Sequence, residues 1–435
     1  MRRLHHLLLA VHVNVQLFGK QKTRDWAYSV LKTVVILMLP RSEFCVAKIL
    51  WYGDACSNTG FGRVTHSVLD ALHKDHEVHV IGINYNGDPH EHPYPIWPAS
   101  NLHVHDRFGI PRLPDIINRV KPDFVIALND VWVVNQVWER IQFLKDQIGF
   151  KFLAYVPIDS QSYQPDMFRH LPHWDLAVTF TIPSANKILE HAKAPRLGVL
   201  PHGVSLDKFF PLDKKACRDE LGLPQDKFIV FNGNRNQPRK RIDLTLKAFA
   251  EFATDKPDAM LYLNMGSKDM GWDVKALFNH EMIRRGLDPK YRLAMTTPNE
   301  INYMDAPPDE MLNKIYNAVD VGINTADGEG WGLVSFEHGA CRRPQIVPNH
   351  TACADIWEGD ALLTNVSTWV RDKDLGVERG LVSVEHLSEQ LTQLYADPQL
   401  CEEIGQKCYE VTQKPEYRWE NVAAGFTAAI QELSK

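Results

Sequence analysis

The sequence contains few cysteines, no apolar run long enough to cross a membrane and no excess of positive charge. Its seven cysteines are scattered over 435 residues without a C-x-x-C pair, which argues against a disulfide framework or a zinc site and favours a reducing compartment. The 48 Lys and Arg against 54 Asp and Glu give a net charge of −6, unlike the basic surface of a nucleic-acid-binding protein. These absences predict a cytoplasmic protein with no nucleic acid partner and with at most peripheral membrane contact.

Residues 1–45 differ in character from the rest and are interpreted as an N-terminal extension. Two arginines precede the apolar stretch 7–11, but histidines interrupt it and no small-residue cleavage site of a secretory signal follows. The run 30–39 contains a lysine and has about half of the roughly 20 residues that a bilayer requires. We expect an amphipathic arm, with Met38 as an alternative start and membrane association as an alternative role.

The remaining sequence predicts two α/β domains in tandem. The full chain of 435 residues is 44% hydrophobic and 23% charged, which is typical of globular proteins. At about 150 residues per domain, this length suits two large or three small domains. Short apolar runs separated by helix-length segments predict parallel sheets covered on both faces. These runs are 46–52, 78–83, 124–128, 152–156 and 176–180, then 228–231, 259–263, 319–323 and 344–347.

The boundaries between these parts follow from the same pattern. We assign 46–203 to an N-terminal domain and 225–410 to a C-terminal domain. The intervening segment 204–224 is polar and punctuated by proline, as linkers are. Apolar residues at helical spacing predict a terminal helix within 411–435. Because ligands of such sheets bind beyond the carboxyl ends of the strands, we expect the site in a cleft between the two sheets.

A first candidate anion site is the glycine loop after the first predicted strand. Gly60 and Gly62 precede a helical pattern, and glycines there let backbone N–H groups approach a phosphate at the helix N-terminus. A dinucleotide-binding fold is the rival interpretation. Its third glycine would stand where Thr65 is, and its ribose-binding acid where Asn84 is, so a nicotinamide oxidoreductase is disfavoured.

A second candidate lies directly after the first strand of the second half. Arg235 and Lys240 flank the loop between that strand and the next helix. Both cations can converge on one anion above the strand end, since an arginine binds as a planar fork and a lysine as a point charge. The alternative is a solvated basic loop around 239–241.

The third candidate is a glycine loop that contains two glutamates. Gly332 precedes a helix predicted to begin near Leu333 and Val334, where backbone donors and the helix dipole favour a diphosphate. Glu337 lies one turn into this helix, on the face of Leu333, and Glu329 lies in the loop. Two carboxylates beside an anion cradle suit ligand hydroxyl groups, which they bind as charged acceptors.

With seven residues between them, Glu329 and Glu337 resemble the E-x7-E motif of retaining glycosyltransferase family 4, which has the GT-B fold. Three further segments resemble the same family in the right order, namely 59–63, 201–204 and the run 234–243. That last run is also similar to a subgroup found in large DNA viruses and phages.

This resemblance extends over 46–435 and implies two Rossmann-like domains whose sheets face each other across a cleft. The N-terminal domain would bind the acceptor, the C-terminal domain the donor, and the last helix would cross back to the N-terminal domain. The implied activity is a hexosyl-type transfer from a UDP- or GDP-linked sugar to an acceptor hydroxyl, with retention and without a metal or cofactor. A carbohydrate, a lipid-linked sugar or a protein glycan remains open as acceptor, within carbohydrate biosynthesis.

The resemblance also implies roles for individual residues. Two cations would neutralise the donor diphosphate and one glutamate would contact the transferred sugar; this catalytic set is Arg235, Lys240 and Glu329. The donor-binding set, which holds the ribose and a phosphate, is Gly60, Gly62, Gly332, Leu333, Val334 and Glu337. Many family members also have a cleft histidine, whose role cannot be placed on this chain. Asn129, Asp130 and Asp159 stand at comparable strand ends and are candidate sugar or acceptor contacts.

Other functions remain open from the residues alone. The one D-x-D sequence, 372–374, lies late in the chain, so we do not expect the metal-bridged diphosphate site of the other major glycosyltransferase fold. A nucleotide-sugar epimerase on the same two-domain plan and a non-catalytic nucleotide-sugar-binding protein are the alternatives to a transferase.

Overall fold

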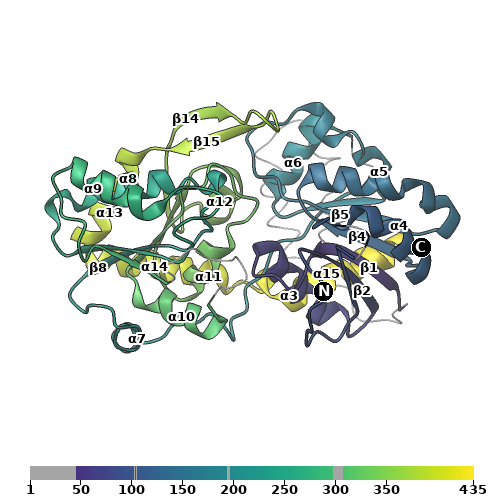
Figure 1. The fold of residues 1–435 in the computed structure, drawn as a ribbon, viewed down its shortest axis with the longest axis horizontal. Helices are drawn as coiled ribbons and strands as arrows, with labels where there is room; N and C mark the ends of the chain where they lie inside the picture. The colour runs from purple at the N-terminus through teal and green to yellow at the C-terminus, as the bar shows by residue number, and fades with distance from the viewer. Residues whose placement is uncertain (1–45, 102, 104, 194–195, 297–306) are drawn as a thin grey trace, which may run out of the picture.

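Two parallel sheets form the frame of the molecule (Figure 1). The computed structural model describes residues 46–101, 103, 105–193, 196–296 and 307–435, so the predicted extension 1–45 lies outside them. The first sheet has seven strands in the order β3-β2-β1-β4-β5-β6-β7, and the second has six in the order β10-β9-β8-β11-β12-β13. Every neighbouring pair in both sheets is parallel, which confirms the α/β prediction.

Helices cover both faces of the first sheet, which explains why its central strands are continuous apolar runs. Its strands are β1 (Lys48–Asp54), β2 (Glu77–Ile83), β3 (Ile96–Pro98), β4 (Phe124–Leu128), β5 (Lys151–Tyr155), β6 (Leu176–Thr179) and β7 (Leu197–Val199). Its helices are α3 (Gly60–Leu72), α4 (Leu113–Val120), α5 (Val131–Ile148) and α6 (Ile182–His191). Neither β3 nor β7 was predicted, because three residues carry little periodic pattern.

The second sheet is built in the same way. Its strands are β8 (Phe228–Asn232), β9 (Ala259–Leu263), β10 (Leu293–Met295), β11 (Val321–Ile323), β12 (Gln345–Pro348) and β13 (Leu362–Thr364). Its helices are α8 (Ile242–Phe252), α9 (Val274–Arg284), α10 (Asp309–Ala318), α11 (Leu333–Ala340), α12 (Thr351–Trp357), α13 (Val384–Ala396) and α14 (Pro398–Thr412). A further helix, α7 (Lys214–Leu221), lies within the predicted linker 204–224 and packs against α10. In the described part of the chain, none of the helices combines the length and the apolar character needed to cross a bilayer.

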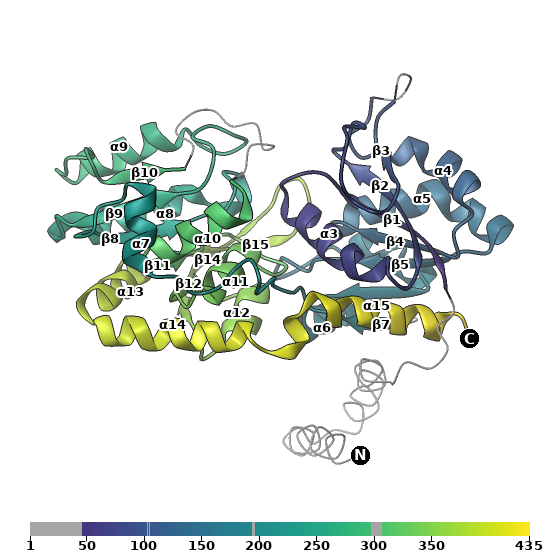
Figure 2. The ribbon, with the colours of Figure 1, turned by 90° about the horizontal axis from the view of Figure 1, so that it is seen from below.

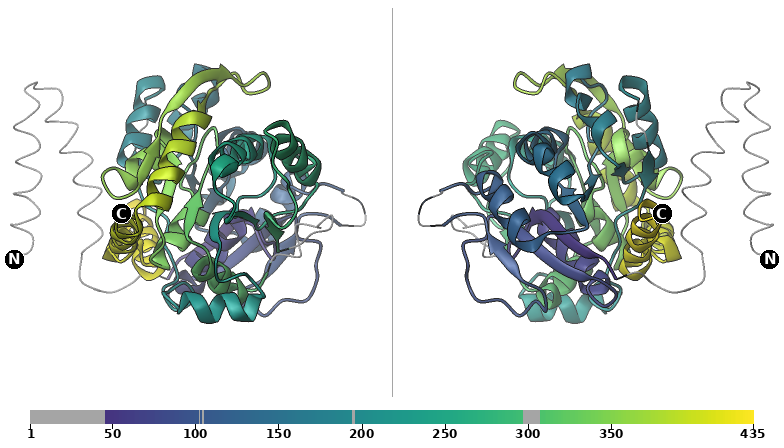
Figure 3. Two further views of the ribbon diagram at one scale, coloured as in Figure 1. Left: turned by 90° about the vertical axis from the view of Figure 1, so that its left-hand side faces the viewer. Right: turned by 90° about the vertical axis from the view of Figure 1, so that its right-hand side faces the viewer.

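An antiparallel hairpin, β14 (Val366–Arg371) and β15 (Glu378–Val382), stands at the upper edge of the molecule and reaches the first domain (Figures 1 and 3). The N–H of Gln161 donates to the Glu378 carbonyl at 3.0 Å, and the N–H of Glu378 donates to the Ser162 carbonyl at 3.3 Å. The hairpin was not predicted. It joins the two domains on one side of the molecule through backbone hydrogen bonds.

The last helix, α15 (Trp419–Leu433), crosses back and packs against α3 of the first domain (Figure 2). The ring of Phe426 lies 5.6 Å from that of Trp51 and 5.1 Å from that of Tyr155, between centroids. A Cβ atom on Gly203 would lie 2.8 Å from the Trp419 ring. A glycine is therefore required where the segment that leaves the first domain meets the start of α15, which returns to it. The expected crossing helix is therefore confirmed.

Replacing Phe426 by alanine should destabilise the protein by about 3–5 kcal/mol, because the buried ring leaves a cavity among Trp51 and Tyr155. Urea unfolding measures the change. Phe143→Ala is the matched control, since the Phe143 side chain is 56% exposed and its loss should cost little. Equal destabilisation by both substitutions would contradict the packing role of α15.

Candidate functional site

The centre of the site is a buried ion pair between Lys240 and Glu329. The short 3-10 turn Pro238–Lys240 follows β8, and Glu329 follows β11. Lys240 Nζ lies 2.5 Å from Glu329 Oε1, and Arg239 Nη1 lies 3.3 Å from Glu329 Oε2. Asn324 Nδ2 donates to Oε1 at 3.2 Å. Because β8 and β11 are neighbours in the sheet, their carboxyl ends bring these charges together.

Burial and charge oppose each other in this cluster. Burial disfavours ionisation of Glu329, but Lys240 and Arg239 outweigh it and hold the pKa of the carboxyl below its ordinary value. Burial lowers the pKa of Lys240, and the charge of Arg239 lowers it further, whereas Glu329 acts in the opposite direction. Glu329 is therefore held as a carboxylate between Lys240 and Arg239.

The loop before α11 lies against the first domain. Gly332 has φ +92°, a left-handed conformation that favours glycine. A Cβ on Gly330 would lie 2.6 Å from Pro157 Cβ, so the chain approaches the first domain too closely for a side chain. Leu333 and Val334 open α11, and N–H groups of a first helical turn have no intrahelical acceptor. The loop therefore presents backbone donors at the domain boundary.

Glu337 is held by a contact between the domains. Tyr316 donates to its Oε2 at 3.1 Å, and Arg63 Nε of α3 lies 3.1 Å from its Oε1. Burial raises the pKa of Glu337, although Arg63 acts to lower it. Arg63 Nη2 also lies 2.7 Å from Asp309 Oδ1. Sequence reasoning missed Arg63 as a partner, although it directly follows the glycine loop.

Gly60 and Gly62, predicted as a loop before the helix, lie in the first turn of α3 and have different environments. A Cβ on Gly60 would lie 3.5 Å from Leu333 Cδ1, so this loop meets the start of α11 across the domain boundary. The N–H of Gly62 donates to Thr59 Oγ1 at 3.0 Å, which caps α3. A Cβ on Gly62 would lie 2.3 Å from the Ser57 carbonyl oxygen. Gly62 thus serves the turn, and its N–H is already engaged.

Arg235 forms its ion pair with Asp269, whereas Lys240 forms its ion pair with Glu329. Its Nε and Nη2 donate to the two oxygens of Asp269 at 2.6 and 3.0 Å. Its charge also acts to lower the pKa of Asp54 in the first domain, although burial raises that pKa overall. The convergence of Arg235 with Lys240 on one anion stays a prediction.

The candidate acceptor contacts gather on the Arg239 side of the cluster. Asp159 Oδ2 lies 3.0 Å from Arg379 Nη1 and 3.9 Å from Arg239 Nε. These cations hold the pKa of Asp159 below its ordinary value despite its burial, whereas burial and the charge of Asp159 raise the pKa of Asp130. Asn129 Oδ1 accepts the N–H of Asp130 at 2.9 Å. Nothing in the sequence indicated Arg379, which lies on the hairpin strand β15.

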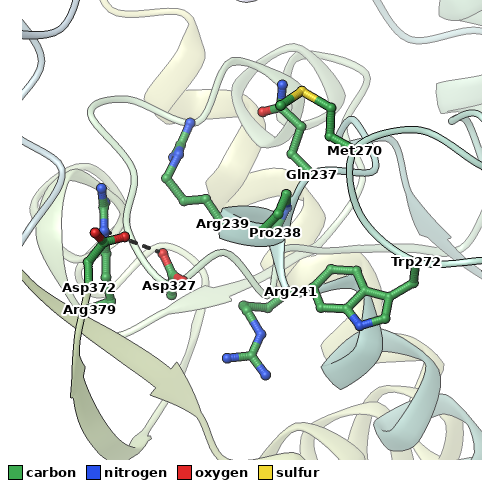
Figure 4. Close-up of a pocket in the computed structure, with 9 residues that line it drawn as sticks. All are labelled: Gln237, Pro238, Arg239, Arg241, Met270, Trp272, Asp327, Asp372 and Arg379. Atoms are coloured by element: carbon green, nitrogen blue, oxygen red, sulfur yellow. Dashed lines mark ion pairs between the residues drawn. The ribbon is translucent and has the colours of Figure 1, made fainter. Parts of the chain in front are cut away.

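A pocket of about 460 Å³ opens beside this cluster (Figure 4). Figure 4 shows Arg239 and Arg241 pointing away from each other, with Asp327 facing Arg379. Its lining residues are Gln237, Pro238, Arg239, Arg241, Met270, Trp272, Asp327, Asp372 and Arg379. All of them belong to the second domain and its hairpin.

One further cluster has residue types that bind metals. Ligand-type atoms of Cys56, His66 and His92 lie within 4.8 Å of one another. The rings of His66 and His92 stack with centroids 3.6 Å apart and planes inclined by 1°, so one ion cannot lie in both ring planes. His66 Nε2 also accepts the N–H of Cys56 at 2.9 Å. In this arrangement the two histidine rings form a packed stack, and the three residues do not form a coordination site.

Comparison with known proteins places this geometry in a class. No protein-family model matches the chain. It is 31% identical over 176 residues to the D-inositol 3-phosphate glycosyltransferase of Geodermatophilus obscurus, covering 40% of this chain and 37% of that protein. It is 28% identical over 245 residues to the enzyme of the same name from Segniliparus rotundus, covering 55% and 48%. The chain thus spans less than half the length of these curated relatives.

The solved structures agree over a longer stretch. Sucrose-phosphate synthase from Thermosynechococcus elongatus superimposes with a TM-score of 0.70 at 18% identity, covering 89% of this chain and 98% of that one. Anabaena HepE, solved in complex with UDP and glucose, gives a TM-score of 0.67 at 14% identity, with 89% and 100% covered. The chain therefore has the GT-B fold. The partial sequence matches are to enzymes named as glycosyltransferases.

Asp327 should make the stability of the protein depend on pH. Burial raises the pKa of its carboxyl from 3.8 to about 6, so the native state holds its proton more tightly than the unfolded chain does. The free energy of unfolding should therefore fall by up to about 3 kcal/mol as the pH rises from about 4 to about 6. Asp327→Asn should flatten this fall in urea titrations at several pH values. Asp374→Asn, on the exposed hairpin turn, should keep the wild-type slope, and an equal slope in both variants would contradict the assignment.

Proposed function

We propose that the protein is a retaining glycosyltransferase, which moves a sugar from a nucleoside diphosphate sugar to an acceptor hydroxyl. The observation that carries this proposal is the pair of buried carboxylates, Glu329 and Glu337, on either side of the start of α11. One contacts two cations and the other contacts Tyr316. The GT-B fold and the partial sequence matches support the same class.

Stabilising the leaving nucleoside diphosphate is the main task in such a reaction. Positive charge develops on the anomeric carbon, and negative charge develops on the leaving diphosphate. Lys240 and the first N–H groups of α11 are positioned by the buried loop, and preorganised donors of this kind are worth several kcal/mol in a water-excluded site. In this proposal Arg235 adds a further cation, and Gly60 lets the first domain approach from the opposite side.

The carboxylates bind the two ends of the donor. Glu329 would accept hydrogen bonds from the transferred sugar, while its ionised state is maintained by Lys240 and Arg239. Glu337 would accept from the ribose hydroxyls, with Tyr316 fixing its orientation. In this role both are binding groups, so the two-carboxylate logic of glycoside hydrolases does not apply. The acceptor proton can pass to the leaving diphosphate on the same face, which gives retention without a dedicated base.

The finer assignments are proposals as well. We assign 46–203 to the acceptor domain, 204–224 to the linker, 225–410 to the donor domain and 411–435 to the crossing segment. UDP is the nucleotide to test before GDP, because HepE was solved with UDP and glucose. The similarity of the loop 234–243 to a viral and phage subgroup remains an inference from the sequence.

Lys240→Ala should weaken UDP binding at least about tenfold, because it removes the cation proposed to contact the diphosphate. Calorimetric titration measures the affinity, and the rise of the melting temperature with UDP concentration provides a second measurement. Lys247→Ala on α8 is the matched control and should bind UDP as the wild type does. Unchanged UDP affinity in Lys240→Ala would refute the proposed diphosphate site.

Glu329→Gln should lower turnover of UDP-glucose at least about a hundredfold with a much smaller effect on UDP affinity, because the lost charge acts on the reacting sugar. Release of UDP measures the rate, and product analysis for an isomerised sugar distinguishes transfer or hydrolysis from epimerisation. Glu389→Gln, exposed on α13, is the control. A rate near that of the wild type would exclude Glu329 from the reaction.

A further inference from the structure

The pocket of about 460 Å³ is assembled at the carboxyl end of the second sheet. The turn with Arg239 and Arg241 follows β8, the loop with Trp272 follows β9, and Asp327 follows β11. Ligands of open α/β sheets bind at this edge, and the volume lies in the range of small-molecule sites. The hairpin residue Arg379 closes one wall, as Figure 4 shows.

The cations of this pocket are already paired, which distinguishes it from an anion site. Arg241 donates to both oxygens of Asp243 at 3.0 and 2.7 Å. Arg379 Nη1 lies 3.0 Å from Asp159 Oδ2, and Arg239 is engaged by Glu329. A phosphate would have to compete with these carboxylates for every guanidinium. The pocket therefore suits an uncharged ligand better than a nucleoside diphosphate.

One carboxylate oxygen of a lining residue has no hydrogen-bond partner among the described residues. Asp327 Oδ1 is buried and accepts no hydrogen bond from any residue that the structure describes; its nearest cation, Arg379 Nε, is 3.8 Å away. The backbone of Asp327 is fixed on both sides, since its N–H donates to the Arg239 carbonyl and its carbonyl accepts from Gly380, each at 2.9 Å. A buried carboxylate oxygen held in this way requires a donor, and a ligand hydroxyl can supply it.

The pocket also contains apolar surface. Trp272 lines it together with Met270, whose side chain is 62% exposed. An aromatic ring beside carboxylates and guanidinium groups matches a sugar ring, which has apolar C–H faces and hydroxyl edges. Arg239 connects this pocket to the proposed reaction centre, because it lines the pocket and also contacts Glu329 at 3.3 Å.

We propose that this pocket binds a neutral pyranose ring of the acceptor, outside the nucleotide site, so that an acceptor held by domain 46–203 extends past the docked hairpin onto the second domain. The inference rests on the proposed glycosyltransferase function and names a substrate class for it. Trp272 packs against the apolar face of the ring, Asp327 accepts from one hydroxyl, and Arg239 donates to another. Because Arg379 and Asp372 come from the hairpin that bonds to the first domain, the pocket is complete only when the hairpin is docked.

Saturation-transfer NMR on the full chain tests the proposal, with methyl α-D-glucopyranoside and methyl α-D-mannopyranoside as probes. Each is titrated alone and in the presence of saturating UDP. We expect saturation of the ring protons of at least one glycoside, and we expect it to persist with UDP present. Trp272→Ala and Asp327→Asn should each lower the association constant at least about fivefold. The matched controls are Trp369→Ala and Asp374→Asn, both on the hairpin but outside the pocket, and they should leave the association constant unchanged.

Three results would overturn the proposal. Loss of the signal on adding UDP would place the glycoside in the donor site. An association constant unchanged in both pocket variants would place it elsewhere on the protein. No signal from either glycoside, in a sample that binds UDP, would reject the sugar pocket while leaving the proposed transferase function intact. Failure of both UDP and GDP to bind would refute the transferase function, and the acceptor pocket with it.

Discussion

The buried ion pair between Lys240 and Glu329 is the interaction on which the site depends. Removing two charges from water costs several kcal/mol each, and the cost is recovered only with close geometry and further hydrogen bonds. Arg239 and Asn324 supply those bonds to the Glu329 carboxylate. The ends of β8 and β11 are therefore held together by charges that tolerate little displacement. The same charges also explain why Glu329 stays ionised in a place where an isolated carboxylate would not.

Burial decided how much of the fold could be predicted. The runs 124–128 and 259–263 coincide with β4 and β9 because both faces of these strands are covered, which leaves a continuous apolar signal. Four of the five three-residue strands, β3, β7, β10 and β13, were not predicted because they carry too few side chains for a pattern, whereas β11 falls within the predicted run 319–323. The hairpin β14–β15 was missed for another reason: Trp369 and its neighbours on β14 are largely exposed, so the strand has no apolar run, and its docking depends on residues far away in the sequence.

Proximity in the site could be predicted within one sheet but not between domains. Lys240 and Glu329 meet because neighbouring parallel strands end at the same edge, which the strand pattern implies. Arg63 reaches Glu337 only because α3 docks onto the second domain, and no spacing in the sequence encodes that contact. Arg235 pairs with Asp269 in the loop after β9, because β9 adjoins β8 on the other side. Its convergence with Lys240 on one anion therefore stays a prediction.

The crossing of α15 has a consequence for biosynthesis. This helix supplies Phe426 to the core around Trp51 and Tyr155, yet it follows the whole second domain in the chain. A nascent first domain emerging from the ribosome therefore has an uncovered apolar surface until the second domain has been translated. Domains usually fold in order during synthesis. Here the first domain can complete its core only after α15, the last helix of the chain, has been translated. A chaperone that shields this surface would aid maturation more than one that acts on the completed chain.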